Sequence, residues 1–387
     1  MAPARIDLTP DLRLGGGALA ELPDALARAG CQTVLIITDR VMEELGYLAR
    51  VEDVLSTAGL TSSAFLDTVP EPTIDCVDAG LSAYAREAYD GLVALGGGSA
   101  IDTAKAMSAR LAYDQPMGAL KVPHIIARRG PPVIAIPTTA GTGSEVTRVT
   151  VITDARTDEK MLCMGPGLMP AAAIVDYELT LTVPPRTTAD TGIDSLTHAI
   201  EAYVSRKANA FSDQQALGAM RLIAKHIRTA FHEPDNHAAR DAMMTGAMMA
   251  GMAFSNASVA LVHGMSRPIG AFFHVPHGLS NAMLLPAITR WSIPGAPARY
   301  ADCARAMGVA GPDSSDHDAC EQLVEALVSL NGELRVPAMS EFGLDSARYH
   351  AVLETMAEQA QASGSPANNP RQPSTADMVA LYRQVWS

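Results

Sequence analysis

The sequence predicts an α/β domain with a mostly parallel sheet, followed by an all-α domain. In the first half, short apolar runs rich in β-branched residues alternate with segments of helical spacing. In the second half, strand signals fade, and Ala-, Met- and Leu-rich segments with helical periodicity continue to Trp386. The pattern changes within residues 182–188, where Pro184 and Pro185 interrupt regular structure. We therefore expect one domain at residues 1–185 and a second at residues 186–387, with a cleft between them.

Three short segments of the first half are candidates for buried parallel strands. Thr33–Thr38, Gly91–Leu95 and Pro132–Ile136 are apolar runs of the length that buried strands have. Segments with helical spacing follow the first two runs, at Val41–Ala58 and Ile101–Leu111. Since a strand followed by a helix is the repeating unit of a parallel sheet covered by helices, these segments predict that architecture.

The second half contains one strongly apolar segment and two polar ones. Ala242–Phe254 is Met-rich and interrupted by Gly246 and Gly251, which predicts a tightly packed core helix. Residues 311–317 and 363–373 are rich in Gly, Pro, Ser and Asn, so we expect surface loops there.

Composition and charge exclude several classes of partner. The net charge of −13 argues against binding to nucleic acid or an anionic membrane, both of which need clustered Lys and Arg. No run of about 18 apolar residues is present, so no membrane span is expected. The N-terminus has no apolar segment of a secretory signal. The five cysteines are scattered without a CxxC pair, which predicts reduced thiols in a cytoplasmic protein.

Two glycine-rich turns suggest a phosphate-binding region. Gly96, Gly97, Gly98 and Ser99 lie directly after a predicted strand and before a predicted helix, where backbone N–H groups are free to bind an anion. Residues 137–145 are dense in glycines and hydroxyls that suit a pyrophosphate or ribose. One such turn alone is often purely structural, but two in one α/β domain favour dinucleotide binding. Residues 15–17 are also glycines, but they precede the first clear strand, and we interpret them as a hairpin or turn.

Asp39 ends the first predicted strand, where a carboxylate could accept hydrogen bonds from ribose hydroxyls. It would also repel a 2′-phosphate, which favours NAD over NADP. The same position suits an N-cap aspartate, and the spacing does not separate the two interpretations.

One carboxylate and three imidazoles are candidates for a metal site. Asp194 and His198 are four residues apart on a predicted helix and share a face, and His263 and His277 follow downstream. This mixed N and O set suits Fe(II) or Zn(II). Spacing alone leaves a structural alternative, since histidines in apolar helices are often hydrogen-bonded core residues.

Long blocks of the sequence resemble the iron-containing (group III) alcohol dehydrogenase family. They follow the family's order and span almost the whole chain: GGGSAIDTAKA (residues 96–106), PTTAGTGSEVT (137–147), GIDSLTHAIEAYVS (192–205) and HGMSRPIGAFFHVPHG (263–278), with weaker matches at residues 14–23 and 369–374. The resemblance implies an α/β dinucleotide-binding domain, a helical metal-binding domain and an active site in the cleft between them.

The resemblance also implies roles for individual residues. The implied metal ligands are Asp194, His198, His263 and His277, with Fe(II) as the expected ion and Zn(II) as the alternative. The implied cofactor is NAD rather than NADP, in contact with Asp39, Gly97, Gly98, Ser99, Thr138, Thr139, Ser144, Thr147 and Lys160.

Two departures from the family pattern affect the site. Several relatives carry a histidine, a candidate proton shuttle, where this chain has Arg267. Here the proton would have to pass through His274, or through cofactor hydroxyls and water. The family's common PNPT turn is Pro70-Glu71-Pro72-Thr73 in this chain, which changes contacts near the cofactor.

The predicted activity is reversible oxidation of a primary alcohol, diol or ω-hydroxy acid to the aldehyde, with hydride transfer to the nicotinamide. Arg267 could bind a substrate carboxylate, or it could pair with a neighbouring helix; Phe254 could line the substrate pocket or belong to the core. The alternatives are a zinc-dependent polyol dehydrogenase and a non-catalytic scaffold. The expected partners are a small alcohol or aldehyde and further copies of the chain, in a homodimer or larger homo-oligomer.

Overall fold

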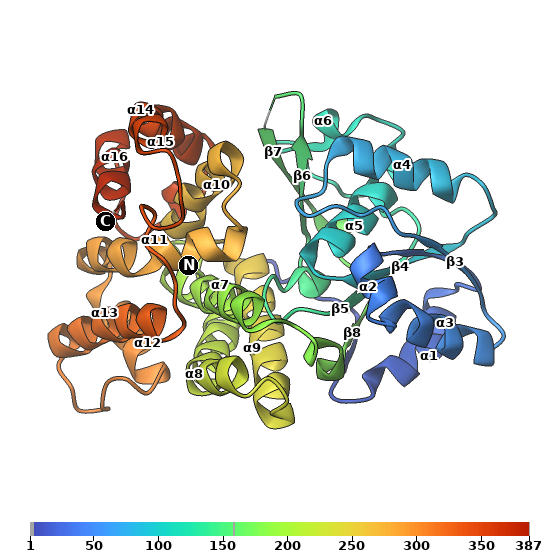
Figure 1. Cartoon of the computed structure of the whole chain (residues 1–387), viewed down its shortest axis with the longest axis horizontal. Helices are drawn as coiled ribbons and strands as arrows, with labels where there is room; N and C mark the ends of the chain where they lie inside the picture. Colours follow the sequence, from blue (N-terminus) through green and yellow to red (C-terminus); the bar gives the residue numbers. More distant parts are fainter. Residues whose placement is uncertain (1–3, 158, 387) are drawn as a thin grey trace. The chain divides into compact units, whose positions relative to one another are not determined.

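The computed structural model describes residues 4–157 and 159–386, which divide into two compact units. One unit comprises Asp7–Val183, and the other comprises Pro184–Ser387 together with Met1–Ile6. The first is an α/β unit and the second is helical, which confirms the predicted fold class (Figure 1).

Six parallel strands form the sheet of the α/β unit, in the order β1-β8-β5-β4-β2-β3. Their bounds are β1 (Asp11–Leu14), β2 (Thr33–Ile37), β3 (Thr61–Phe65), β4 (Gly91–Gly96), β5 (Val133–Pro137) and β8 (Ala172–Val175). A separate antiparallel hairpin consists of β6 (Val149–Asp154) and β7 (Glu159–Met164).

Helices cover both faces of the sheet (Figure 1). Alternate residues of β2 show the division: Val34 and Ile36 pack with α1 (Leu22–Ala29) and α3 (Tyr47–Thr57), and Leu35 and Ile37 pack with the opposite layer. The opposite layer contains α4 (Ile74–Tyr84), α5 (Gly98–Tyr113) and α6 (Met117–Leu120). Burial of both faces explains why the central strands are continuous apolar runs.

The α/β unit corrects two expectations from the sequence. The predicted helix at Val41–Ala58 is two helices, α2 (Arg40–Glu44) and α3, because Gly46 adopts a left-handed conformation (φ 76°) between them. The glycines at 15–17 follow a strand, because β1 is a short edge strand with two charged residues that shows no apolar run. They form a turn that leads toward α1 and not a hairpin, since β1 pairs in parallel with β8.

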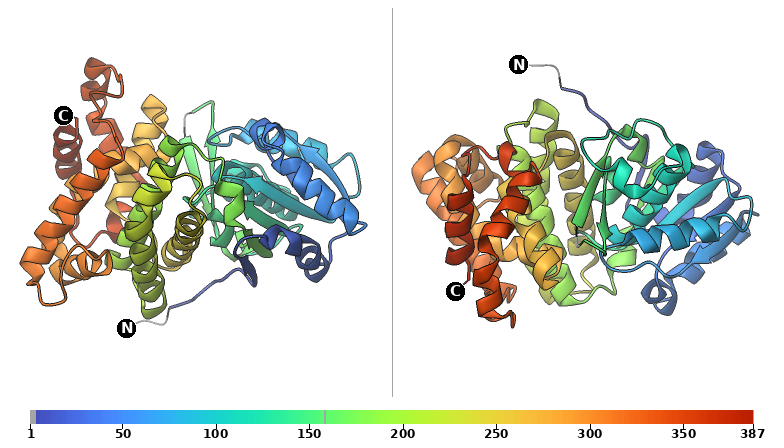
Figure 2. Two further views of the ribbon diagram at one scale, coloured as in Figure 1. Left: turned by 60° about the horizontal axis from the view of Figure 1, so that its bottom comes forward. Right: turned by 90° about the horizontal axis from the view of Figure 1, so that it is seen from above.

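The helical unit is formed around α7, α8 and α9, which lie side by side (green to yellow in Figure 2). Gly246 of α9 allows close packing, because a Cβ there would lie 2.7 Å from Ile223 of α8. This confirms that the Met-rich segment is a core helix. The helices are α7 (Pro185–Val204), α8 (Ala210–His232), α9 (His237–Ala257), α10 (Leu261–Phe273), α11 (His277–Ser292), α12 (Pro297–Ala306), α13 (Asp316–Glu333), α14 (Ser346–Ala351), α15 (Leu353–Ala362) and α16 (Thr375–Gln384).

The segment at residues 363–373 was expected to be a surface loop, and this expectation is wrong for its centre. Ser365, Asn368 and Asn369 are buried, and the two asparagine side chains donate hydrogen bonds to Ser258 and Ser292. Buried asparagines need such partners, and they fix the course of the segment through the helical unit.

Within the described residues, no single helix is long and apolar enough to cross a membrane. One pair, α9 with α10, meets the length and composition criteria only together, across a 103° bend.

Candidate functional site

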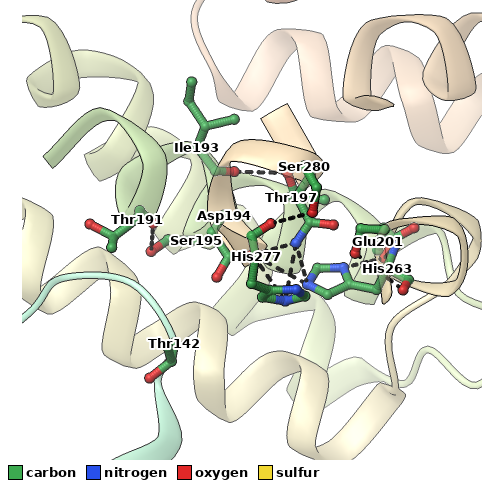
Figure 3. A network of polar contacts seen from close by, with 12 residues as sticks. Thr142, Thr191, Ile193, Asp194, Ser195, Thr197, Glu201, His263, His277 and Ser280 are labelled. Carbon is green, nitrogen blue, oxygen red and sulfur yellow. Dashed lines mark hydrogen bonds and ion pairs between the residues drawn. The ribbon is translucent and has the colours of Figure 1, made fainter. Parts of the chain in front are cut away.

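Three of the four predicted metal ligands converge in the helical unit (Figure 3). Asp194 comes from α7, His263 from α10 and His277 from the first position of α11, and their ligand atoms lie within 4.8 Å of one another. The Asp194 Oδ1 atom is 3.4 Å from His263 Nε2 and 3.8 Å from His277 Nε2. A carboxylate oxygen and two imidazole nitrogens, gathered at a largely buried place, form a donor set that fits Fe(II) or Zn(II).

His198 adjoins this cluster without belonging to the group of three mutually close ligand atoms. Its ring stacks between His263, at 4.3 Å between centroids, and Phe254, at 4.2 Å. Burial raises the pKa of Asp194, but the combined effect of His198, His277 and His263 is larger and holds this pKa well below its ordinary range. The Asp194 side chain is therefore an anion, as a metal ligand must be. The role of His198 as the fourth ligand stays a prediction.

Asn281 is a polar residue of the cluster that the sequence analysis missed. Its Nδ2 atom lies 2.6 Å from Asp194 Oδ1, 3.2 Å from His263 Nε2 and 3.3 Å from His277 Nε2. Its Oδ1 atom is buried and has no hydrogen-bond partner among the described residues. Asn281 thus joins all three candidate ligands. It follows His277 by four residues on α11, and this helical spacing could have identified it.

The three predicted catalytic residues lie in different environments. Phe254 stacks on His198 and is partly buried, so it contacts the metal cluster. Arg267 is partly buried, and its Nη1 donates a hydrogen bond to Ser365 Oγ at 2.9 Å. His274 is exposed and ends α10 in a left-handed conformation (φ 55°). The catalytic roles of these residues stay predictions.

In the α/β unit, the predicted cofactor residues follow the carboxyl ends of three adjacent strands. Asp39 comes after β2, Gly97 and Gly98 after β4, and Thr138 and Thr139 after β5. From β2 the chain continues outward to β3, whereas from β4 it continues to β5 on the other side. The sheet therefore has its topological switch point between β2 and β4, the place where open α/β sheets bind ligands.

The start of α5 has the properties of a phosphate-binding turn. Gly96 has a φ of 149°, and no side chain caps the helix at Gly97. A Cβ at Gly98 would lie 2.8 Å from the Thr142 side chain, so only glycine fits there without a shift. The first-turn N–H groups of this 16-residue helix and its positive dipole end suit an anion.

Asp39 caps α2, because its Oδ1 accepts a hydrogen bond from the Met42 backbone N–H at 3.0 Å. Asp39 is therefore an N-cap residue, as one of the two interpretations of the sequence predicted. Capping uses Oδ1, and the ribose role of the carboxylate stays a prediction.

Ser144 and Thr147 belong to a buried polar network centred on Lys105 of α5. The Lys105 Nζ lies 2.5–3.0 Å from five oxygens, namely both the carbonyl and the hydroxyl of Ser144 and of Thr147, and the Val149 carbonyl. The Ser144 hydroxyl donates to Asp102 Oδ1 at 2.7 Å. Lys105 thereby fixes the segment that follows the second glycine-rich turn.

Burial changes the protonation of this network. It lowers the pKa of Lys105 to about 8, although Asp102 and Glu145 oppose the change. It raises the pKa of Glu145 to about 7. The sequence analysis did not identify these three residues; Asp102 and Lys105 are three apart on α5 and share a face, which was the available signal.

Lys160 of β7 forms an ion pair with Glu71, at 2.6 Å from Nζ to Oε1. Glu71 is the residue that departs from the family's PNPT turn, and it has a φ of 52°. The predicted cofactor residue Lys160 and the unusual residue Glu71 are therefore partners in one ion pair.

Comparison with known proteins agrees with this geometry. Residues 9–177 match the family described as "Iron-containing alcohol dehydrogenase", and residues 188–386 match "Fe-containing alcohol dehydrogenase family, C-terminal". The chain is 36% identical to lactaldehyde reductase of Escherichia coli over 385 residues, 99% of each chain. The chain belongs to the iron-containing alcohol dehydrogenase family.

Solved structures extend the similarity to the fold. The crystal structure of a 1,3-propanediol oxidoreductase has a TM-score of 0.94 and 31% identity, with coverage of 99% of this chain and 100% of that one. Sulfoacetaldehyde reductase of Bifidobacterium kashiwanohense, in complex with NAD+, has a TM-score of 0.89 and 27% identity, with full coverage of both chains. As a member of this family, the protein is an oxidoreductase that acts on alcohols or aldehydes, with a metal site at Asp194, His263 and His277.

Proposed function

We propose that the protein is a metal-dependent, NAD-linked dehydrogenase that reversibly oxidises a primary alcohol, diol or ω-hydroxy acid to the aldehyde. The observation that carries the proposal is the buried cluster of Asp194, His263 and His277. A carboxylate and two imidazoles that meet at one point have no evident structural use that apolar residues would not serve better.

The proposed ligands of the metal are Asp194, His198, His263 and His277, with Fe(II) as the expected ion and Zn(II) as the alternative. When bound, the cation supplies Lewis-acid polarisation of the substrate oxygen. The residues of the chain fix its surroundings: Asp194 stays ionised, Asn281 donates a hydrogen bond to the Asp194 carboxylate, and the Phe254 ring stacks on the His198 ring. His274 or water is proposed to carry the proton.

The proposed cofactor is NAD. The support in this chain is the uncapped start of α5 at the switch point and the carboxylate of Asp39, which would repel a 2′-phosphate. A relative with the same fold binds NAD+. The remaining proposed contacts are Ser99, Thr138, Thr139, Ser144, Thr147 and Lys160, of which Ser144 and Thr147 act through the Lys105 network.

The proposed substrate class is broad, because similar proteins are named for lactaldehyde, 1,3-propanediol, butanol and long-chain alcohols. An ω-hydroxy acid would require Arg267 to bind its carboxylate. The hydrogen bond to Ser365 uses one donor of that guanidinium. Arg267→Ala is expected to raise the KM for 4-hydroxybutyrate and to leave that for 1,2-propanediol unchanged; equal effects on both would exclude the carboxylate role.

The test of the proposal is anaerobic NAD reduction by the metal-stripped protein, with Fe(II) or Zn(II) added back. The substrate panel contains ethanol, 1,2-propanediol and 4-hydroxybutyrate, and NADP is the control cofactor. We expect turnover to return with the metal and to be faster with NAD. If neither Fe(II) nor Zn(II) restores turnover with any of the three substrates and either cofactor, the proposal is contradicted.

We also propose a cytoplasmic homodimer or larger homo-oligomer. The five cysteines are all free and buried, which is typical of proteins from a reducing compartment. Light scattering of the purified protein would give its mass, and the mass of a monomer would contradict the proposed homo-oligomer.

A further inference from the structure

Glu201 is a buried acid of α7 that lies outside the predicted ligand set and contacts one of its members. It follows Asp194 by seven residues and His198 by three, so all three share a face of the helix. Only 3% of its surface is exposed. Its carboxylate accepts a hydrogen bond from the ring nitrogen Nδ1 of His263 at 2.7 Å (Figure 3).

This contact determines which nitrogen of His263 faces the other ligands. A carboxylate only accepts hydrogen bonds, so in the neutral imidazole Nδ1 carries the proton and Nε2 holds the lone pair. Nε2 is the atom that lies 3.4 Å from Asp194 Oδ1. The lone pair that a cation needs is therefore directed into the cluster before any cation binds.

The same carboxylate holds the backbone that carries His263. Its oxygens accept hydrogen bonds from the N–H groups of Ala260, at 2.9 Å, and Val262, at 2.5 Å. Ala260 is the N-cap of α10 and has no side chain to cap the helix. Glu201 therefore substitutes for the missing cap from another helix, and the positive end of α10 offsets its charge.

A second positive group faces Glu201 from the same helix. Arg267 lies one turn after His263 on α10; burial lowers the pKa of its guanidinium, and the charge of Glu201 opposes this effect. The buried carboxylate of Glu201 thus has three backbone donors, Ala260, Val262 and His263, together with an imidazole donor and a nearby guanidinium, so its oxygens are well satisfied.

We propose that Glu201 is a positioning residue of the metal centre, which fixes the tautomer and the ring orientation of His263 through Nδ1 and anchors the start of α10. The inference rests on the proposed function, because it requires that His263 ligates a metal. Groups that orient metal-bound histidines in this way typically change metal affinity about 10–100-fold when they are removed.

The test compares Glu201→Gln with a matched cap variant, Asn209→Ala. Asn209 caps α8 through Phe211 and Ser212 in the same unit. For each protein, Co(II) affinity is measured by competition with a chelator, the visible Co(II) spectrum is recorded, and thermal unfolding is followed without metal. We expect E201Q to weaken Co(II) binding about 10–100-fold and to alter the spectrum. We expect N209A to lower the unfolding temperature and to leave affinity and spectrum unchanged.

Unchanged affinity and spectrum in E201Q, with a loss of stability like that of N209A, would show that Glu201 is only a helix cap. A wild type that binds no Co(II) would overturn the metal site and this inference together, and wild-type binding without turnover would count against the proposed reaction alone. If E201Q does not fold, ¹⁵N NMR of the histidine-labelled wild type tests the proposal by showing which ring nitrogen of His263 carries the proton. The spectrum is recorded at a pH at which the His263 ring of the metal-free protein is neutral: a proton on Nδ1 supports the proposal, and a proton on Nε2 contradicts it.

Discussion

Individual residues around the metal cluster show how the chain prepares a site for a cation. Asn281 donates a hydrogen bond to Asp194, and its Nδ2 atom also lies within hydrogen-bond distance of Nε2 of His263 and His277, so one amide group contacts all three candidate ligands. We predict that Asn281→Ala weakens metal binding on the order of tenfold, the lower end of the effect of outer contacts on metal sites. Chelator competition with Zn(II) measures it.

Asn331→Ala is the control for Asn281. Asn331 of α13 donates to the carbonyl of Ala282, the next residue on α11, and its hydrogen bond reaches none of the ligands. A loss of affinity in Asn331→Ala that equals the loss in Asn281→Ala would assign the effect to the helix and not to the ligand contacts.

Glu145 gives the α/β unit a pH-dependent stability. Burial raises its pKa from 4.5 to about 7, so the folded state retains a proton that the unfolded chain releases between these pH values. The free energy of unfolding of the wild type should therefore fall as pH rises from 4.5 to 7, relative to Glu145→Gln. The expected difference is roughly 3 kcal/mol across that range. Urea unfolding at pH 5 and pH 7.5, followed by far-ultraviolet circular dichroism, measures it.

Glu44→Gln provides the comparison for Glu145, because Glu44 is an exposed glutamate of the same unit. Parallel pH profiles for the wild type and E145Q would contradict the account of Glu145.

At the scale of elements, α5 connects the first glycine-rich turn to the second. It begins at the turn after β4, and its Lys105 side chain binds five oxygens of the segment that follows the second turn. Lys105→Met removes these hydrogen bonds and leaves two buried acids without their cation. We predict a loss of about 3–5 kcal/mol in the stability of the unit, and faster hydrogen exchange at the amides of residues 144–149.

Arg110→Met tests whether that loss is specific to the buried network. Arg110 lies further along the same helix and pairs with Asp78, whose side chain is half exposed. Its loss should cost at most about 1 kcal/mol. A loss as large as that of Lys105→Met would mean that α5 is simply intolerant of substitution.

The strands and helices differ in how well the sequence predicted them. The central strands β2, β4 and β5 were found because both of their faces are buried and their residues are continuously apolar. The other strands were missed. Strand β1 is short and charged, and β3 and the hairpin strands β6 and β7 contain many polar residues. Strand β8 is buried and apolar but has only four residues, too short a run to stand out. Gly46 was included in a helix because its left-handed conformation leaves no trace in the apolar spacing.

The site residues also differ in how well the sequence predicted them. Asp194, His263 and His277 could be named from spacing and resemblance, and they converge. Helical spacing could have placed Glu201, Asn281 and Lys105 on the relevant helix faces, but it could not give their roles, because those depend on contacts with residues 39–87 positions away in the chain. Helical spacing places such residues on a face but does not show what that face meets.

At the scale of the whole molecule, the metal should stabilise one unit selectively. Its proposed ligands all come from helices of the helical unit, and both tryptophans, Trp291 and Trp386, lie in that unit. Removal of the metal should lower the stability reported by tryptophan fluorescence, by about 2.7 kcal/mol relative to protein with metal at 100 times its Kd. Hydrogen exchange of β4 and β5 amides should change little.

An equal loss of protection in the sheet and in the helices would contradict this separation. An unchanged fluorescence transition would contradict the metal site itself.

The central claim is that hydride passes from an alcohol carbon to NAD in a reaction that needs the metal. The most direct measurement uses 1,2-propanediol with two deuterium atoms on C1, incubated with NAD and either the metal-stripped or the Fe(II)-loaded protein. We expect deuterium at C4 of the reduced nicotinamide with the Fe(II)-loaded protein only. Deuterium transfer at the same rate without metal, or reduced nicotinamide that carries no deuterium, would contradict it.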